Sequence, residues 1–233
     1  MDAVLCLLPS PLLGPACWQP VSDVLSDRGF AVARRGPALG DAPRTPRTGT
    51  DVLAAYLAAV PPDRDVVLVP HSNAGLFVPS LADQRRVAGY VFVDAGLPLD
   101  GADRVPMIPP EFYEMLAGKA DGDGLLPPWT QWWDEDSVSE LFPDAGTRAA
   151  VEREESRLPL SYFAETVPVP PGWADRAGAY LAFGDTYAAQ RASAVARGWP
   201  VTTLVGDHLH MLVDPAAVAD AITDLIAGLP GVG

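Results

Sequence analysis

The stretch VVLVPHSNAGLFVP, residues 66–79, decides the fold. It starts as a run of strand-forming residues and changes abruptly at Ser72, which is followed by Asn73 and two small residues, Ala74 and Gly75. Small neighbours let a strand and the next helix approach closely. The pattern therefore predicts a strand that turns sharply into a helix, with the Ser72 side chain at the apex of the turn. The alternative is a serine that only caps the helix.

The rest of the chain alternates between strands and helices. Six short apolar runs are typical of buried strands: 2–8, 30–34, 65–69, 89–94, 178–183 and 200–205. Between several of these runs, apolar residues recur at helical spacing. Asp214 and Pro215 mark the start of the last helix. Because each strand is apolar on both faces, we expect an α/β protein with a mostly parallel sheet of about six strands and helices on both faces. The first strand should lie inside the sheet, beside the strand that ends in Ser72.

Residues 97–175 interrupt this alternation. They hold 9 of the 19 aromatic residues and 11 of the 25 prolines, with helical pieces at 111–117 and 145–156 and no clear strand. We interpret this segment as a helical lid, inserted within a single domain of residues 1–233. It should cover the C-terminal edge of the sheet, where ligands bind in open parallel sheets.

The turn at Ser72 resembles the nucleophile elbow of the α/β-hydrolase fold, with Pro70 and Ala74 in place of the usual flanking glycines. A serine hydroxyl needs a base with a pKa near 7, and histidine is that base. The segment GDHLHMLVDPAAVADAI (206–222) is similar to the histidine loop of small esterases with this fold. The resemblance implies that His208 is the general base and His210 a neighbour. An ordinary surface histidine is the alternative.

Two carboxylates compete for the role of orienting this histidine. Asp94 ends the strand GYVFVD (89–94), a position from which some members of the fold take their acid. Asp185 follows the next-to-last strand, which is the commoner location, but it could equally cap the next helix. We favour Asp94 and keep Asp185 open.

The resemblance also implies two backbone donors for an oxyanion. One is the N–H of Asn73, and the other comes from the loop after the first strand, at Pro11 or Leu12. Proline has no N–H, so Leu12 must donate. The family usually has His-Gly in this loop, and Pro9-Ser10 stands there instead, which places efficient hydrolysis in doubt.

The expected function is a cofactor-free serine hydrolase that cleaves an ester, lactone or thioester of a small, largely apolar molecule. The aromatic residues of the lid could line its pocket, although any one of them could simply pin the lid: Trp129, Trp132, Trp133, Phe142, Tyr162, Phe163 and Trp173. A lyase or cyclase that shuttles protons through His208 is the alternative, and a non-catalytic binding module is a third reading.

Charge and composition exclude several other classes. The net charge is −14, and residues 97–175 carry 16 Asp and Glu against 5 Lys and Arg, which disfavours nucleic acid and anionic substrates. No apolar run reaches the roughly 18 residues of a membrane span. The apolar start, residues 1–16, carries Asp2 where a secretion signal would carry Lys or Arg. Three histidines and two distant cysteines do not predict a metal site.

Cys6 and Cys17 are the only cysteines, so a reducing cytoplasm is the expected compartment. The expected partner is a small-molecule substrate. A homodimer is one option for the assembly, which the sequence does not fix.

Overall fold

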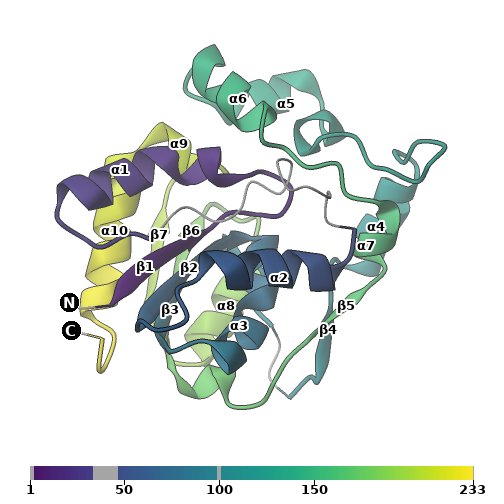
Figure 1. The fold of residues 1–233 in the computed structure, drawn as a ribbon. Helices are drawn as coiled ribbons and strands as arrows, with labels where there is room; N and C mark the ends of the chain where they lie inside the picture. The colour runs from purple at the N-terminus through teal and green to yellow at the C-terminus, as the bar shows by residue number, and fades with distance from the viewer. Residues whose placement is uncertain (1–2, 34–46, 99–100, 233) are drawn as a thin grey trace.

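The computed structural model describes residues 3–33, 47–98 and 101–232. Its main sheet has five strands, all parallel, in the order β1-β2-β3-β6-β7 (Figure 1). They are β1 (Val4–Leu8), β2 (Val66–Ser72), β3 (Val87–Ala95), β6 (Ala177–Phe183) and β7 (Val201–Leu204). The parallel sheet is confirmed, and so is the pairing of the first strand with the strand that ends in Ser72. The expectation that the first strand lies inside the sheet is wrong for the described residues, because β1 is the end strand and only an isolated bridge lies on its outer side.

The predicted strand at 30–34 is reduced to a single bridge. Val32 pairs in parallel with Leu5 of β1, and two backbone hydrogen bonds hold it there, from Leu5 N to Ala31 O and from Ala33 N to Leu5 O, each 2.8 Å. The prediction of a full strand is therefore wrong for the described part of the segment. Arg34 at its end lies outside the described residues, as does Asp2 at the start of the first predicted strand.

Helices cover both faces of the sheet (Figure 1). On one face α1 (Gln19–Asp27) packs against α10 (Pro215–Ala227), and on the other α2 (Gly49–Ala59) packs against α3 (Val78–Gln84). A further helix, α8 (Ala188–Ala196), packs on β6 and β7. The α10 helix begins as predicted, because the Asp214 carboxylate accepts a hydrogen bond from Ala217 N and Pro215 lies in the first turn.

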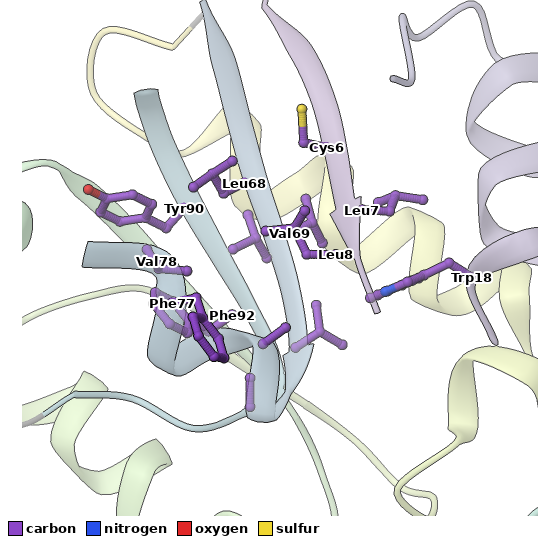
Figure 2. Close-up of a cluster of buried hydrophobic side chains, with 14 of the residues drawn as sticks. Cys6, Leu7, Leu8, Trp18, Leu68, Val69, Phe77, Val78, Tyr90 and Phe92 are labelled. Atoms are coloured by element: carbon purple, nitrogen blue, oxygen red, sulfur yellow. The ribbon is translucent and has the colours of Figure 1, made fainter. Parts of the chain in front are cut away.

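The strands next to β2 are apolar on both faces, as a sheet covered by two layers of helices requires. Figure 2 shows the side chains of Leu7, Leu8, Leu68, Val69 and Phe92 around β1, β2 and β3, with Trp18 and Phe77 from the adjoining helical segments. All seven are buried. This packing fixes the C-terminal ends of the central strands, where the candidate site lies.

The chain between β3 and β6 consists mostly of helical segments, some of which lie above the strand ends and others beside the sheet (Figure 1). We call its described residues, 101–175, the insertion. It contains β4 (Arg104–Pro106), α4 (Pro110–Ala117), η4 (Trp129–Trp132), α5 (Glu135–Glu140), α6 (Ala145–Glu152), α7 (Leu160–Phe163), β5 (Thr166–Pro168) and η5 (Trp173–Asp175).

The expectation that residues 97–175 hold no strand is wrong. Strands β4 and β5 pair in an antiparallel fashion, with Val105 opposite Val167. Each strand has three residues, of which only the central valine is buried. An alternation of three residues is too short to stand out in a sequence.

The turn from β2 into the 3₁₀ segment η3 (Asn73–Phe77) requires glycine at position 75. A Cβ atom there would lie 2.0 Å from the carbonyl oxygen of Gly96, just after β3. The backbone at Gly96 cannot easily retreat, because its N–H donates to the Ser72 carbonyl oxygen at 2.9 Å. The close approach of turn and strand end therefore depends on the missing side chain.

We predict that Gly75→Ala lowers the free energy of unfolding by about 1–3 kcal/mol, since the added methyl group forces two backbone segments apart. Urea denaturation measures this. Gly122→Ala is the matched control, because a Cβ at Gly122 meets nothing within 4 Å. Equal stability of Gly75→Ala and the wild type would show that the turn does not need this contact.

Candidate active site

Ser72 ends β2 and precedes η3, in the sharp turn that the sequence predicts. Its backbone is strained, with φ 57° and ψ −132°, and its side chain is mostly buried. Among the described non-glycine residues, only Ser72 and Asp94 have positive φ. Such conformations cost on the order of 1–3 kcal/mol each and cluster at functional sites.

Asp94 and His208 are joined by a short hydrogen bond. The Nδ1 atom of His208 lies 2.7 Å from Oδ2 of Asp94, whose side chain is fully buried. The other carboxyl oxygen of Asp94 accepts a hydrogen bond from the N–H of Phe183 at 3.2 Å. An ionised carboxylate can only accept, so this contact selects the tautomer in which Nδ1 carries the proton of a neutral His208 ring and Nε2 keeps its lone pair.

The competing residues lie elsewhere. Asp185 pairs with Arg191 at 2.9 Å, and its side chain is 86% exposed. His210 starts the short helix α9 (His210–Val213), and its ring packs against Phe183 at 5.5 Å between centroids. The hydrogen-bond partner of His208 is thus Asp94 and not Asp185.

A third histidine, His71, contacts the backbone of His208. Its Nε2 atom lies 2.9 Å from the carbonyl oxygen of His208, and the two rings lie 4.4 Å apart. Burial, reinforced by the nearby His208, holds the pKa of His71 well below its usual value, so its ring is neutral. It therefore donates through Nε2–H. Sequence reasoning left this residue without a role, because its partner is a main-chain atom 137 residues away.

Leu12, Ser72, Asn73 and His208 line the same cavity. The N–H of Leu12 donates a long, weak hydrogen bond of 3.4 Å to the Ser10 hydroxyl oxygen. Because Pro11 has no N–H, the N–H of Leu12 is the candidate for the second oxyanion donor. Asn73 is the first residue of η3, and the first N–H groups of a helix lack acceptors within it.

The insertion is tied directly to these residues. The side-chain amide of Asn73 donates to Met107 O at 2.9 Å and accepts from the Tyr162 hydroxyl at 2.8 Å. Ser156 N donates to the carbonyl oxygen of Leu12 at 3.2 Å. The insertion therefore also holds the turn at Ser72 and the loop that contains Leu12.

The cavity has a volume of about 970 Å³. Four of the seven aromatic residues predicted for the pocket line it: Trp129, Trp132, Trp133 and Phe163. Of the other three, Tyr162 bonds to Asn73, Trp173 packs on Tyr90 in the core, and Phe142 is buried but does not line the cavity. Among the described residues no Lys or Arg lines the cavity, whereas Asp134, Glu140 and Asp207 do.

One lining residue was not foreseen. The hydroxyl of Tyr187 lies 3.3 Å from Oγ of Ser72, and its ring lies 5.7 Å from that of His208. Tyr187 lies in the same turn as Asp185, directly after β6. Its place just after a predicted strand is the sequence signal that could have identified it.

No protein-family model and no curated protein matches this sequence. Solved structures match it over nearly its whole length. An extracellular α/β-hydrolase from a Paenibacillus species has 16% identity and a TM-score of 0.74, covering 96% of this chain and 98% of that one. Tomato methylketone synthase I, complexed with 2-tridecanone, has 16% identity and a TM-score of 0.73, covering 97% and 98%.

A mutant of polyneuridine aldehyde esterase has 18% identity and a TM-score of 0.71, covering 97% of this chain and 99% of that one. Similarity at this level of identity defines the fold. The chain has the α/β-hydrolase fold, which confirms the fold that the sequence predicts.

Two features are absent from the described part of the chain. No helix in it is both long and apolar enough to cross a membrane. No three of its His, Cys, Asp and Glu side chains come close enough to hold a metal ion.

Glu155 anchors the aromatic wall of the cavity. Its carboxylate accepts hydrogen bonds from Thr130 N at 3.0 Å and from the Thr130 hydroxyl at 2.8 Å, next to Trp129 in η4. Burial raises the pKa of Glu155 to about 7, although the two bonds from Thr130 lower it. The folded protein therefore holds this proton more tightly than the unfolded chain does.

We predict that this proton makes the folded protein less stable as pH rises. A raised folded-state pKa gives stability that is complete below the ordinary value of 4.5 and is lost as pH rises through about 7. Glu155→Gln mimics the protonated form, so its stability relative to the wild type should increase across that interval. Thermal unfolding at several pH values measures this. Glu114→Gln, which removes a charge from an exposed position of α4, is the control. A difference that does not vary with pH would contradict the assignment.

Proposed function

We propose that the chain is a serine hydrolase that cleaves an ester-type bond through an acyl-enzyme on Ser72. The observation that carries this proposal is the hydrogen bond between His208 and the buried Asp94, next to a strained Ser72 on the wall of one cavity. The roles follow from the chemistry of these groups. Ser72 is the nucleophile, His208 the general base and Asp94 the group that orients and stabilises the imidazolium.

The reaction would run in two stages. In acylation, Nε2 of His208 takes the Ser72 proton while Oγ attacks the carbonyl carbon, and the same proton then passes to the leaving alcohol or thiol. In deacylation, a water molecule repeats the attack and Ser72 leaves. The N–H groups of Asn73 and Leu12 would stabilise the oxyanion in both stages, and a donor of this type contributes on the order of a hundred- to a thousandfold in rate.

The cavity indicates the substrate class. Its wall is mostly apolar, and the charged residues that line it are acidic. A small, largely apolar and uncharged ester, lactone or thioester fits this chemistry, whereas an anionic molecule would be repelled. The fold neighbours include a protein named as an esterase and a synthase complexed with 2-tridecanone, an apolar ketone.

A lyase or cyclase is the second candidate, and one observation favours it. Pro11 has no N–H, and the N–H of Leu12 already faces Ser10. An enzyme that shuttles protons through His208 without an acyl-enzyme does not need a complete oxyanion hole.

The expected compartment is a reducing cytoplasm, because Cys6 and Cys17 are buried, free thiols. The proposed reaction uses no cofactor. We expect a small molecule as the partner and a homodimer as one option.

We predict that a fluorophosphonate probe adds one mass equivalent to the protein, at Ser72. Labelling should be lost in Ser72→Ala and in His208→Ala, because the hydroxyl is then absent or not activated. It should persist in His210→Ala, which is the matched control. Intact mass and peptide mapping measure the outcome.

The same variants separate the two candidates. A hydrolase loses nearly all turnover in Ser72→Ala and transfers heavy oxygen from labelled water to its acid product. Turnover that survives Ser72→Ala, without oxygen from water in the product, would instead establish the lyase or cyclase.

A further inference from the structure

Tyr187 is placed to act on the nucleophile itself. It is the last residue of the turn after β6 and immediately precedes α8, and its hydroxyl lies 3.3 Å from Oγ of Ser72. Its ring is tilted by 31° to that of His208, and it lines the cavity beside both residues. Leu12, in contrast, comes from the loop after β1. The phenol thus contacts the nucleophile and lies beside the ring of the proposed general base.

The direction of the contact follows from the neighbouring groups. Burial raises the pKa of Tyr187 to about 12, so the phenol keeps its proton at neutral pH. The Nδ1–H of His208 is committed to Asp94, which leaves Nε2 to accept the Ser72 proton. Either hydroxyl can donate in this contact. Because the mechanism sends the Ser72 proton to Nε2 of His208, the proposal assigns the donor role to Tyr187.

We propose that Tyr187 is a further catalytic residue that speeds deacylation, by donating a hydrogen bond to Oγ of Ser72 as this oxygen leaves the acyl carbon. The proposal rests on the acyl-enzyme of the proposed function. It adds a second donor to the departing oxygen, beside the protonated His208 that delivers its proton to Oγ.

Only an interaction that is stronger in the transition state than in the ground state accelerates a step. With Tyr187 as the donor, the serine hydroxyl already accepts this bond in the free enzyme, so acylation gains little from it. In the acyl-enzyme Oγ is an ester oxygen, which is a weak acceptor. As the C–Oγ bond breaks, its electron pair stays on Oγ, and the growing negative charge strengthens and shortens the bond from Tyr187.

The proton balance needs no additional reactant. The attacking water gives one proton to Nε2 of His208, and this proton passes to Oγ as the acid product forms. Tyr187 keeps its own proton throughout and acts only as a hydrogen-bond donor. The 3.3 Å contact is longer than a usual O–H···O bond, which fits a contact that tightens during the reaction.

The kinetics of Tyr187→Phe test the proposal, because this change removes the hydroxyl and keeps the ring against His208. With p-nitrophenyl hexanoate the leaving group is good, so deacylation limits kcat. We expect kcat to fall by about tenfold, the size of one hydrogen bond to a developing charge. KM should fall in proportion, kcat/KM should stay near the wild-type value, and the hexanoyl-enzyme should accumulate on Ser72 in quenched intact-mass spectra.

Two controls test whether the effect is specific to deacylation and to Tyr187. Ethyl hexanoate forms the same acyl-enzyme but with a poor leaving group, so acylation limits turnover and Tyr187→Phe should match the wild type. Tyr113→Phe removes a hydroxyl from a tyrosine of α4 that is not among the residues lining the cavity, and should leave both esters unaffected.

A fall in kcat/KM as large as that in kcat, without acyl-enzyme accumulation, would mean that Tyr187 only shapes the cavity. An unchanged kcat on p-nitrophenyl hexanoate would also overturn the proposal. If neither wild type nor Tyr187→Phe ever carries an acyl group on Ser72 while turnover continues, the proposed hydrolase itself is wrong. These three results are distinguishable in one set of measurements.

Discussion

The hydrogen bond between Asp94 and His208 is the constraint on which the site depends. A buried carboxylate is tolerated only where its charge is paired or hydrogen-bonded, and Asp94 is fully buried. Its two oxygens meet His208 from the loop after β7 and the backbone of Phe183 at the end of β6. One side chain at the end of β3 thus joins the C-terminal ends of three chain segments. Its backbone takes a strained positive φ to reach them.

The insertion shares in this arrangement. Met107 and Tyr162 hold the side chain of Asn73, and Ser156 holds the carbonyl of Leu12. The insertion, which supplies much of the cavity wall, is therefore hydrogen-bonded to the turn at Ser72 and to the loop of Leu12. A displacement of the insertion would disturb both the cavity and the groups at its floor, so substrate fit and the geometry of the turn are coupled.

The sequence predicted the features with local signals, namely the strands and the turn at Ser72. It left open the contacts between residues that are far apart in the chain. The apolar runs and the turn at Ser72 indicated a parallel sheet, because buried strands and sharp strand-to-helix turns have short-range signals. Asp94 and Asp185 both follow strands, and only the packed structure shows that Arg191 holds Asp185 at the surface. The pairing of β4 with β5 could not be predicted, since these short strands lie about 60 residues apart in the sequence.

The side chains that sequence reasoning missed share one property: they act through partners far away in the chain. His71 bonds to the main chain of His208, and Tyr187 bonds to Ser72 across 115 residues. A residue type alone does not reveal such a contact. The turn after β6 was considered for its aspartate, and the tyrosine two positions later is the residue that enters the cavity.

The bond between Asp94 and His208 can be observed directly by proton NMR. An imidazole N–H that donates a short hydrogen bond to a buried carboxylate gives a strongly downfield resonance that is protected from exchange with water. We expect this resonance in the wild type and in Asp185→Asn, its absence in His208→Ala, and its loss or a large upfield shift in Asp94→Asn. A resonance that survives Asp94→Asn unchanged and disappears in Asp185→Asn would contradict the pairing and move the acid to the turn after β6.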